Sequence, residues 1–392
     1  MTSHFFKTFE FEFEATRLMW IAPSGGSDFA EVAAVTEKIK DGHYQSWHLE
    51  WKNFAQKLEN RAQGFLSTTN KANALMRASR YYQAAEFFLD PSDTAKLEMY
   101  QKSVSLFYQA LALTNVQYSA HTIQYQETPL RTLYFKTHKQ SKGTFFVCGG
   151  FDALLEELYF TSAIPALNNG YDVVLYEGPG QSDMIRYHQL SFEKNWQLVV
   201  KEVIDFYQHH YQLRMPKIGI GISLGGLLTA RAASLDASLF DRIVLYNYFP
   251  SMIASFKKSL PFFLHRYLDT QFPTWLEKIA STYIAHKKFL NWQVEHAKWT
   301  FAATSLNDLI QKCRDFNEEI ALSQLHTDCL TFVAKNDNYY DYHLGLYFHQ
   351  AIPAKNKKLI LFDKENYSTD LHCQNGSFYD CNDQLYEWLL AK

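Results

Sequence analysis

Several features that would mark a membrane-bound, secreted or nucleic-acid-binding protein are missing from these 392 residues. No uncharged apolar stretch of about 18 residues occurs, so we expect no membrane span. Lysine and arginine total 38 against 41 acidic residues, and this balance gives no basic excess for nucleic acid. The opening residues MTSHFFKTFEFEFEATRL alternate Phe with Glu, unlike the basic and apolar regions of a signal peptide, so we expect none.

Cysteine is scarce, and its spacing indicates neither a disulfide framework nor a metal site. No CxxC pair occurs, and the number of cysteines is odd, which predicts reduced thiols and a cytoplasmic location. The five residues are Cys148, Cys313, Cys329, Cys373 and Cys381. GxGxxG, P-loop and HExxH patterns are also absent, so we expect no nucleotide cofactor and no metal.

The stretch KIGIGISLGG, Lys217–Gly226, carries the strongest chemical signal. Ile218, Ile220 and Ile222 alternate as in a strand, and the alanine- and leucine-rich segment that follows favours a helix. Between them, GISLG matches a nucleophile elbow, in which a serine lies in a strained turn and glycines two residues to either side avoid collisions with backbone. We therefore predict Ser223 as a nucleophile, with an ordinary glycine-rich turn as the alternative.

The first third of the chain is predicted to be helical, because apolar residues recur there at helical spacing. The four segments are Asp28–Lys40, Ser46–Leu66, Lys71–Leu89 and Ser92–Leu113. We predict that residues 1–120 form an N-terminal helical cap region. A tetratricopeptide-like, partner-binding hairpin is the alternative, although no consensus repeats at a fixed period.

From about Ala120 onward, short strands alternate with helices, which predicts an α/β core over residues 121–392. Its sheet should be mostly parallel and covered on both faces, with the first two strands as an antiparallel pair. The eight predicted strands are His121–Tyr125, Arg131–Lys136, Thr144–Cys148, Asp172–Tyr176, Lys217–Ile222, Arg242–Asn247, Cys329–Ala334 and Lys358–Phe362.

A long stretch rich in Phe, Tyr and Trp, Tyr248–Leu325, separates the sixth and seventh predicted strands. It has no convincing strand pattern and favours helices. Because ligands bind at the carboxyl ends of parallel strands, an insertion there commonly forms a lid. We predict a helical lid over about residues 250–325, whose aromatic side chains either line an apolar pocket or pack in the core.

A serine nucleophile needs a base, and the base needs an acid that orients it. In this architecture the acid follows a late strand and the histidine follows the last strand. Only His372, in STDLHC, lies beyond the final predicted strand, so we predict it as the base. KNDN follows Cys329–Ala334 directly, which makes Asp337 the first choice for the acid and Asp341 the second. A surface or capping role is the alternative for these residues.

The oxyanion formed during acyl transfer needs two hydrogen-bond donors. One is expected from the backbone N–H of Leu224, the residue after the nucleophile. The other is expected from the loop after the third strand, CGGFD (Cys148–Asp152), because paired glycines let the backbone approach a substrate closely. We predict the N–H of Phe151 as this second donor.

Four segments together resemble a known family. They are GGFDALLEELYF (Gly149–Phe160), YDVVLYEGPGQS (Tyr171–Ser182), GISLGG and LHCQNG. They resemble the α/β-hydrolase family of pseudooxynicotine hydrolase, the fermentation-respiration switch esterase and fungal polyketide-shortening hydrolases. SWHLEWKNFAQ and ASRYYQAAEFF look like that family's helical cap, so the resemblance covers nearly the whole chain. It implies an α/β-hydrolase fold whose Ser-Asp-His triad, between core and cap, cleaves esters or carbon–carbon bonds beside carbonyls.

The sequence thus predicts a hydrolase that transfers an acyl group from a small-molecule substrate of apolar or aromatic character to Ser223. No nucleic acid is expected as a partner, and a homodimer is compatible with the sequence. The alternative is a non-catalytic regulatory or partner-binding protein built on a hydrolase scaffold.

Overall fold

The computed structural model describes residues 5–317 and 322–391. Parts of the predicted helical region 1–120 and of the predicted lid 250–325, namely residues 1–4 and 318–321, lie outside the described residues. The chain forms two compact units, Met1–Val116 and Gln117–Lys392.

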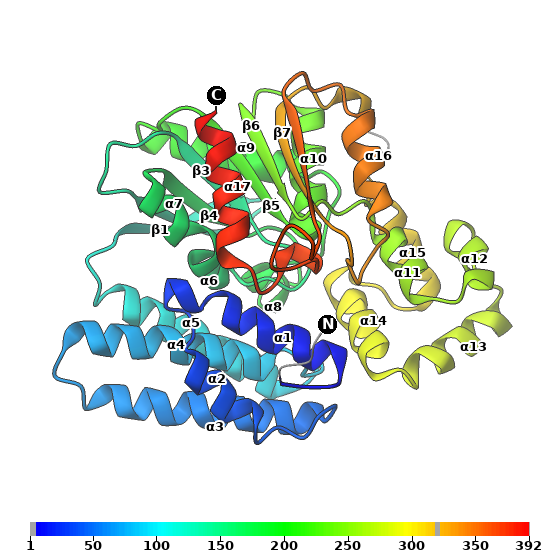
Figure 1. Ribbon diagram of the computed structural model, residues 1–392. Coiled ribbons are helices and arrows are strands. Elements are labelled where there is room, and N and C mark those ends of the chain that lie inside the picture. The colour runs from blue at the N-terminus through cyan, green and yellow to red at the C-terminus, as the bar shows by residue number, and fades with distance from the viewer. Residues whose placement is uncertain (1–4, 318–321, 392) are drawn as a thin grey trace. The chain divides into compact units, whose positions relative to one another are not determined.

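The first unit is helical (Figure 1). Its elements are α1 (Phe9–Trp20), η1 (Ala22–Ser24), α2 (Phe29–Thr36), α3 (Tyr44–Gln63), α4 (Thr68–Glu86) and α5 (Thr94–Leu111). Helices α2, α4 and α5 begin at Asp28, Ser67 and Asp93, whose side chains accept hydrogen bonds from backbone N–H groups of the first turn. Helices α2 to α5 confirm the four helical segments predicted here, with shifted ends.

Helix α1 is an element that the Phe–Glu alternation does not reveal. Phe11 and Phe13 are buried, and so is Glu12 between them. The Glu12 carboxylate accepts hydrogen bonds from the backbone N–H groups of Phe5, at 3.0 Å, and Phe6, at 2.9 Å. These hydrogen bonds compensate for the burial of the Glu12 carboxylate. Glu12 can therefore be buried in a helix, whereas the alternation of Phe with Glu is typical of a strand with its glutamates in solvent.

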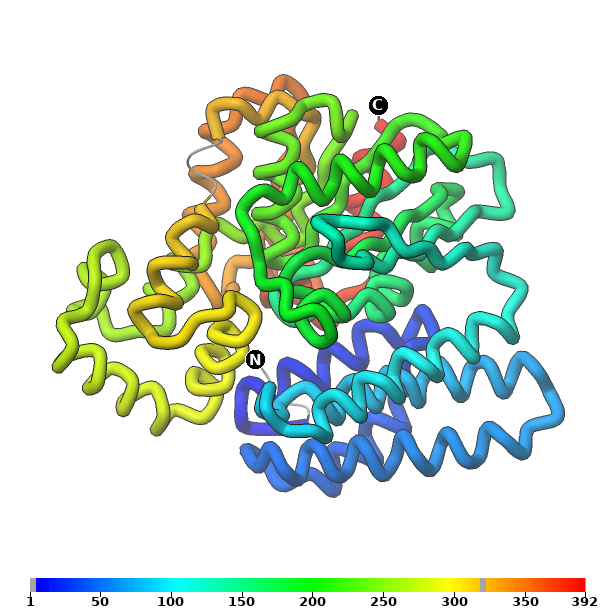
Figure 2. The backbone as a smooth tube through the Cα atoms, turned by 180° about the vertical axis from the view of Figure 1, so that it is seen from behind, coloured from blue at the N-terminus to red at the C-terminus, as the bar shows by residue number. Residues whose placement is uncertain are grey.

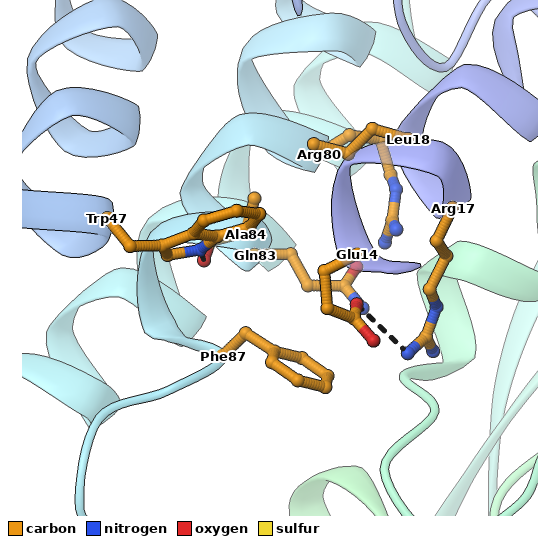
Figure 3. A pocket seen from close by; sticks show the side chains of 8 residues that line it. All are labelled: Glu14, Arg17, Leu18, Trp47, Arg80, Gln83, Ala84 and Phe87. Atoms are coloured by element: carbon orange, nitrogen blue, oxygen red, sulfur yellow. Dashed lines mark hydrogen bonds and ion pairs between the residues drawn. The ribbon is translucent and has the colours of Figure 1, made fainter. Parts of the chain in front are cut away.

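A pocket in the first unit is lined by side chains from α1, α3 and α4 and by Phe87 after α4 (Figure 3). The eight lining residues are Glu14, Arg17, Leu18, Trp47, Arg80, Gln83, Ala84 and Phe87. Arg17 forms an ion pair with Glu14, at 3.4 Å, and its guanidinium lies 5.6 Å from the centre of the Phe87 ring. Arg17 and Glu14 therefore balance each other's charge within this pocket.

The second unit contains an eight-stranded sheet in the order β1-β2-β4-β3-β5-β6-β7-β8. The strands are β1 (Gln117–Tyr125), β2 (Thr128–Lys136), β3 (Thr144–Cys148), β4 (Asp172–Tyr176), β5 (Lys217–Ile222), β6 (Arg242–Tyr246), β7 (Asp328–Ala334) and β8 (Lys357–Phe362). β2 pairs antiparallel with β1 and with β4, and all other neighbours are parallel. The predicted eight-stranded, mostly parallel sheet is confirmed. β1, β2, β7 and β8 begin earlier than predicted, and β6 ends at Tyr246 instead of Asn247.

Helices cover both faces of the sheet, because its central strands are apolar on both sides. Every residue of β3 and β4 is buried. Helices α7 and α17 lie on the face toward the viewer in Figure 1, and α9 lies on the face shown in Figure 2. The helical elements outside the β6–β7 connection are α6 (Leu155–Leu158), η2 (Tyr159–Ala163), α7 (Ile164–Asn169), α8 (Ser182–Arg186), α9 (Trp196–His210), α10 (Leu224–Leu235), α16 (His343–Ala351), η6 (His372–Gln374) and α17 (Phe378–Leu390).

The connection between β6 and β7 is helical, as predicted. It contains α11 (Met252–Ser259), η3 (Phe262–Leu264), α12 (His265–Asp269), α13 (Thr274–Ala285), α14 (Lys288–Thr300), α15 (Leu306–Arg314) and η5 (Leu322–Gln324). Its buried side chains, such as Phe256 and Leu309, belong to the same hydrophobic cluster as Leu224 and Leu227 of α10. The insertion therefore packs as part of the second unit.

Candidate active site

Ser223 occupies the turn between β5 and α10 in a strained backbone conformation. Its φ is 58° and its ψ is −124°, a region that L residues rarely adopt. The Ser223 N–H donates to the Tyr246 carbonyl at 3.0 Å, and the Ser223 carbonyl accepts from the Gly226 N–H at 2.8 Å. These two hydrogen bonds hold the turn, which presents the serine hydroxyl at the carboxyl end of β5.

The two flanking glycines of the turn are required by close backbone contacts. A Cβ atom at Gly221 would lie 2.0 Å from the carbonyl oxygen of Gly225. A Cβ atom at Gly225 would lie 2.5 Å from the carbonyl oxygen of Gly149. Neither position has room for a side chain, so the GxSxG spacing has a direct physical cause here.

The structure brings Ser223, His372 and Asp337 together, although 149 positions separate the serine from the histidine. Ser223 Oγ lies 2.8 Å from His372 Nε2. On the other side of the ring, His372 Nδ1 lies 2.6 Å from Asp337 Oδ2. This arrangement lets the carboxylate accept the Nδ1 proton, which leaves Nε2 to accept a proton from the serine hydroxyl.

Asp337 is a buried carboxylate whose oxygens are engaged on both sides. Oδ2 accepts from His372 and from the side-chain amide of Asn247, at 2.8 Å, and Oδ1 accepts from the Tyr339 N–H, also at 2.8 Å. Asp341, the second choice for the acid, is exposed and pairs with His343 at 2.8 Å instead. The loop path therefore places Asp337, and not Asp341, next to His372.

The pKa of His372 is raised well above its ordinary value. Burial by itself lowers the pKa of the imidazole, because it disfavours the charged form. The negative charge of Asp337 opposes burial, and so do Cys373 and the hydrogen bonds that both residues form with the ring; together they raise the pKa. The pair thus stabilises the imidazolium that forms when the histidine takes a proton.

The predicted oxyanion loop lies against the elbow. A Cβ atom at Gly150 would lie 2.8 Å from Ser223 Cβ and 3.1 Å from the Leu224 nitrogen. Leu224 is the first residue of α10, and Phe151 follows Gly150. The structure therefore places the segments of both predicted N–H donors, Leu224 and Phe151, beside the serine.

Aromatic rings surround the histidine. The ring centre of Tyr339 lies 4.6 Å from that of His372, and those of Phe249 and Tyr340 each lie 6.2 Å from it. Two of these residues follow β7, and Phe249 follows β6. An apolar group bound beside His372 would meet ring surfaces instead of water.

Three residues of this region were not predicted from the sequence to belong to the site. Asn247, which bonds Asp337, stands directly after β6, and its signal is a polar residue at the carboxyl end of a buried strand. Gln181, which bonds the Gly149 and Gly150 carbonyls, lies in the GPGQS segment after β4. His296 of α14, whose Nε2 lies 3.3 Å from the Phe151 carbonyl, has no local signal, since its partner is 145 positions away.

Two features of residues 5–317 and 322–391 bear on other kinds of site. No helix in these ranges combines the length and the apolar composition that a membrane crossing needs. The five cysteines, all within these ranges, are buried, and none of them forms a disulfide.

A mostly parallel eight-stranded sheet, covered by helices and carrying a serine in a strained turn after β5, defines the α/β-hydrolase fold. Comparison with known proteins agrees with this class. The chain is 28% identical over 331 residues to 20-hydroxy-prefusarin hydrolase FUS2 of Gibberella moniliformis, covering 77% of this chain and 76% of that protein. It is 28% identical over 361 residues to hydrolase acrC of Aspergillus aculeatus, covering 82% and 81%. No family model matches the chain.

Solved structures give the same result for the fold. The structure of 2,6-dihydroxy-pseudo-oxynicotine hydrolase superposes with a TM-score of 0.75 at 15% identity, over 95% of this chain and 96% of that one. AbyA5 superposes with a TM-score of 0.67 at 14% identity, over 92% and 90%. The predicted resemblance is confirmed: the chain has the α/β-hydrolase fold, and proteins similar to it over most of its length are named as hydrolases. The chain is therefore an enzyme.

Proposed function

We propose that this hydrolase uses Ser223, His372 and Asp337 as a catalytic triad and forms an acyl-enzyme on Ser223. The observation that carries the proposal is the continuous hydrogen-bonded chain from Ser223 Oγ through both ring nitrogens of His372 to Asp337, at 2.8 and 2.6 Å. A hydroxyl is a weak nucleophile until a positioned base can take its proton. These distances suit that transfer.

In the first half of the reaction, Ser223 Oγ attacks the carbonyl carbon of the substrate and its proton passes to His372 Nε2. The carbonyl oxygen becomes an oxyanion, which accepts hydrogen bonds from the N–H groups of Leu224 and Phe151. The bond to the leaving group then breaks, and that group takes the bonding electron pair and the proton from His372. The products of this half are the released leaving group and the acylated serine.

In the second half, water attacks the acyl carbon and gives one proton to His372. The bond between the acyl carbon and Ser223 Oγ breaks, and the proton returns to the serine oxygen. A carboxylic acid leaves, and the enzyme is restored. With an ester the leaving group is an alcohol; with a β-dicarbonyl it is a carbanion that His372 protonates on carbon.

The substrate class that we propose is a small molecule with an apolar or aromatic acyl part, cleaved at an ester or at a carbon–carbon bond beside a carbonyl. The rings of Phe249 and Tyr339 beside His372 support the apolar character. The relatives named as hydrolases of 20-hydroxy-prefusarin and of 2,6-dihydroxy-pseudo-oxynicotine support a small organic substrate.

We also propose that the helices between β6 and β7 act as a lid. Support comes from α14, where His296 contacts both the carbonyl and the ring of Phe151, with ring centres 4.7 Å apart. A cap role for the N-terminal helical unit, a cytoplasmic location and a homodimer stay predictions.

The triad is tested by labelling with a fluorophosphonate probe, which forms a bond to an activated serine. We expect the wild-type protein to be labelled and Ser223→Ala and His372→Ala to lose labelling. Wild-type protein that is folded but not labelled would favour the non-catalytic alternative. Intact labelling of Ser223→Ala would show that another residue reacts.

The reaction type is tested by comparing aryl and alkyl esters of graded chain length with β-diketones. Hydrolysis of either class should depend on both Ser223 and His372. Equal rates in the wild type and the two alanine variants would overturn the proposed mechanism.

A further inference from the structure

Gln181, in the turn between β4 and α8, holds the oxyanion loop by two hydrogen bonds. Its side-chain Nε2 donates to the carbonyl of Gly149 at 2.7 Å and to the carbonyl of Gly150 at 3.0 Å. The residue is 4% exposed, so water does not compete for these bonds. A single amide group thus fixes two successive carbonyls of the loop that follows β3.

The orientation of the Gln181 amide is determined by a third contact. Its Oε1 accepts a hydrogen bond from the backbone N–H of Gly178 at 3.1 Å. Because the oxygen faces this donor, the NH₂ group must face the two carbonyls. The Gln181 amide is therefore fixed by a contact within its own turn as well as by its contacts with the loop after β3.

Peptide planarity connects this contact to the predicted oxyanion donor. The carbonyl of Gly150 and the N–H of Phe151 belong to one trans peptide unit, in which C=O and N–H point in opposite directions. Holding the Gly150 oxygen toward Gln181 therefore directs the Phe151 N–H away from Gln181. The same peptide unit begins at Gly150, whose Cα lies so close to the elbow that a Cβ there would be 2.8 Å from Ser223 Cβ.

The next peptide unit of the loop is held from a different element. The Phe151 carbonyl lies 3.3 Å from Nε2 of His296, on α14. Three successive carbonyls, those of Gly149, Gly150 and Phe151, thus have side-chain partners from outside the loop. A loop with two adjacent glycines has much backbone freedom, and these contacts remove it.

We propose that Gln181 is a positioning residue of the oxyanion hole, which aims the Phe151 N–H at the developing oxyanion by holding the Gly150 carbonyl. The inference rests on the proposed function, because it concerns how one donor of that mechanism is oriented. The hydrogen bonds described for the Gln181 side chain go to Gly149, Gly150 and Gly178, not to the nucleophile or the base. The effect of Gln181 should therefore fall on stabilisation of the transition state and not on the titration of His372.

The test compares Gln181→Met and Gln181→Glu with the wild type, using p-nitrophenyl butyrate as substrate. Methionine has a similar length without the donor, and glutamate keeps an oxygen for the Gly178 N–H while placing an acceptor against the two carbonyls. We expect kcat to fall about 10- to 100-fold in both variants, with KM within about 2-fold of the wild-type value. The pH at half-maximal kcat/KM should not move. Inhibition by phenylboronic acid, whose serine adduct is tetrahedral, should weaken in parallel with kcat.

Ser182→Ala is the matched control, because Ser182 follows Gln181 directly as the first residue of α8 and is also buried. Its hydroxyl accepts from the Leu155 N–H at 3.2 Å, and no hydrogen bond joins it to the carbonyls that Gln181 holds. We expect this variant to lose stability without losing kcat. An equal fall in kcat in Ser182→Ala would show that general loosening of the turn, not Gln181, is responsible.

The outcomes separate this inference from the proposed function. Hydrolysis that persists in Ser223→Ala contradicts the proposed function itself. Hydrolysis that requires Ser223 but proceeds at the wild-type kcat in folded Gln181 variants contradicts this inference alone. Should Gln181→Met not fold, Gln181→Glu decides the question, since it retains the anchor within the turn.

Discussion

At the scale of single residues, the orientation of the triad depends on the side chain of Asp337. It is 3% exposed, and a carboxylate removed from water needs donors on both oxygens. His372, the Asn247 amide and the Tyr339 N–H supply them. Because Asn247 shares Oδ2 with His372, it holds that oxygen toward the ring. The imidazole tautomer and its distance to Ser223 follow from this anchored carboxylate.

Replacing Asp337 by asparagine should lower both the activity and the pH at which activity appears. The wild-type kcat/KM should rise with pH as His372 loses its proton, with a midpoint above the ordinary imidazole value of about 6.5, because Asp337 raises the pKa of His372. Without that charge, burial lowers this pKa, so the midpoint should move to lower pH. We expect kcat to fall about 10⁴-fold, because the amide favours the wrong tautomer.

Asp341→Asn serves as the control for this experiment, since Asp341 is exposed and pairs with His343. Its pH profile and kcat should match those of the wild type. An unchanged midpoint in Asp337→Asn, or a fall in kcat in Asp341→Asn, would contradict the assignment of the acid.

At the scale of secondary-structure elements, the site forms at one edge of the sheet because parallel strands end there together. β3, β4, β5, β6 and β7 are followed at this edge by Gly149, Gln181, Ser223, Asn247 and Asp337. Tight turns let these segments approach, and the elbow between β5 and α10 is one of them. The atoms nearest to a Cβ at either elbow glycine, Gly221 or Gly225, belong to neighbouring backbone, which cannot move aside as a flexible side chain can.

A methyl group at Gly221 should therefore be costly. Its Cβ would lie 2.0 Å from the Gly225 oxygen and 2.4 Å from the Gly225 carbonyl carbon, both backbone atoms. We expect Gly221→Ala to lower the free energy of unfolding by about 3 kcal/mol or more, as measured by urea denaturation. Gly64→Ala is the control, because its nearest atom would be 3.6 Å away and its φ is −84°; it should change stability by less than about 1 kcal/mol. Equal losses in the two variants would contradict the steric account of the elbow.

At the scale of the whole molecule, a buried cluster makes folding stability depend on pH. Arg131 of β2 pairs with Glu156 at 2.7 Å, Glu177 at 3.1 Å and Asp183 at 2.6 Å, so three carboxylates share one guanidinium. Burial raises the pKa of Glu177 to about 7; Arg131 opposes this, and Asp183 and Glu156 add to it. The cluster joins β2 to the elements before and after the GPGQS turn.

Because the pKa of Glu177 is raised in the folded chain, the free energy of unfolding should decrease as pH rises. Between the ordinary glutamate pKa, about 4.3, and about 7, the folded chain holds a proton on Glu177 that the unfolded chain has lost. The contribution of Glu177 to stability is therefore full below about 4.3 and is lost as pH rises to about 7. His372, whose pKa is also raised, contributes with the same sign. Glu177→Gln does not titrate, so its stability relative to the wild type should increase across this window.

Urea denaturation of Glu177→Gln and wild type at a series of pH values measures this difference. Glu202→Gln, at an exposed acid on α9 outside this cluster, provides the matched control for replacing a glutamate by glutamine. A stability difference for Glu177→Gln that does not change between pH 4 and 8 would contradict the raised pKa.

Local patterns account for much of the fold. Buried parallel strands are short apolar runs, and Thr144–Cys148, Asp172–Tyr176 and Lys217–Ile222 appear in the structure with the ends predicted from sequence. Helix α1 is not revealed by its local pattern. Its Phe and Glu residues alternate as in a strand, but Glu12 is buried in a helix and accepts hydrogen bonds from the backbone. Periodicity cannot reveal a polar group that finds its partners through the fold.

The sequence by itself determined the sheet, the elbow at Ser223 and the order in which acid and histidine follow it, because strand pattern, glycine spacing and chain order are local or sequential properties. Only the tertiary structure decided that Asp337 and not Asp341 faces His372, and that Asn247 and Gln181 support the site. These contacts join residues that lie 31 to 90 positions apart. They depend on the path of loops after parallel strands, which packing of the whole sheet determines and no single segment encodes.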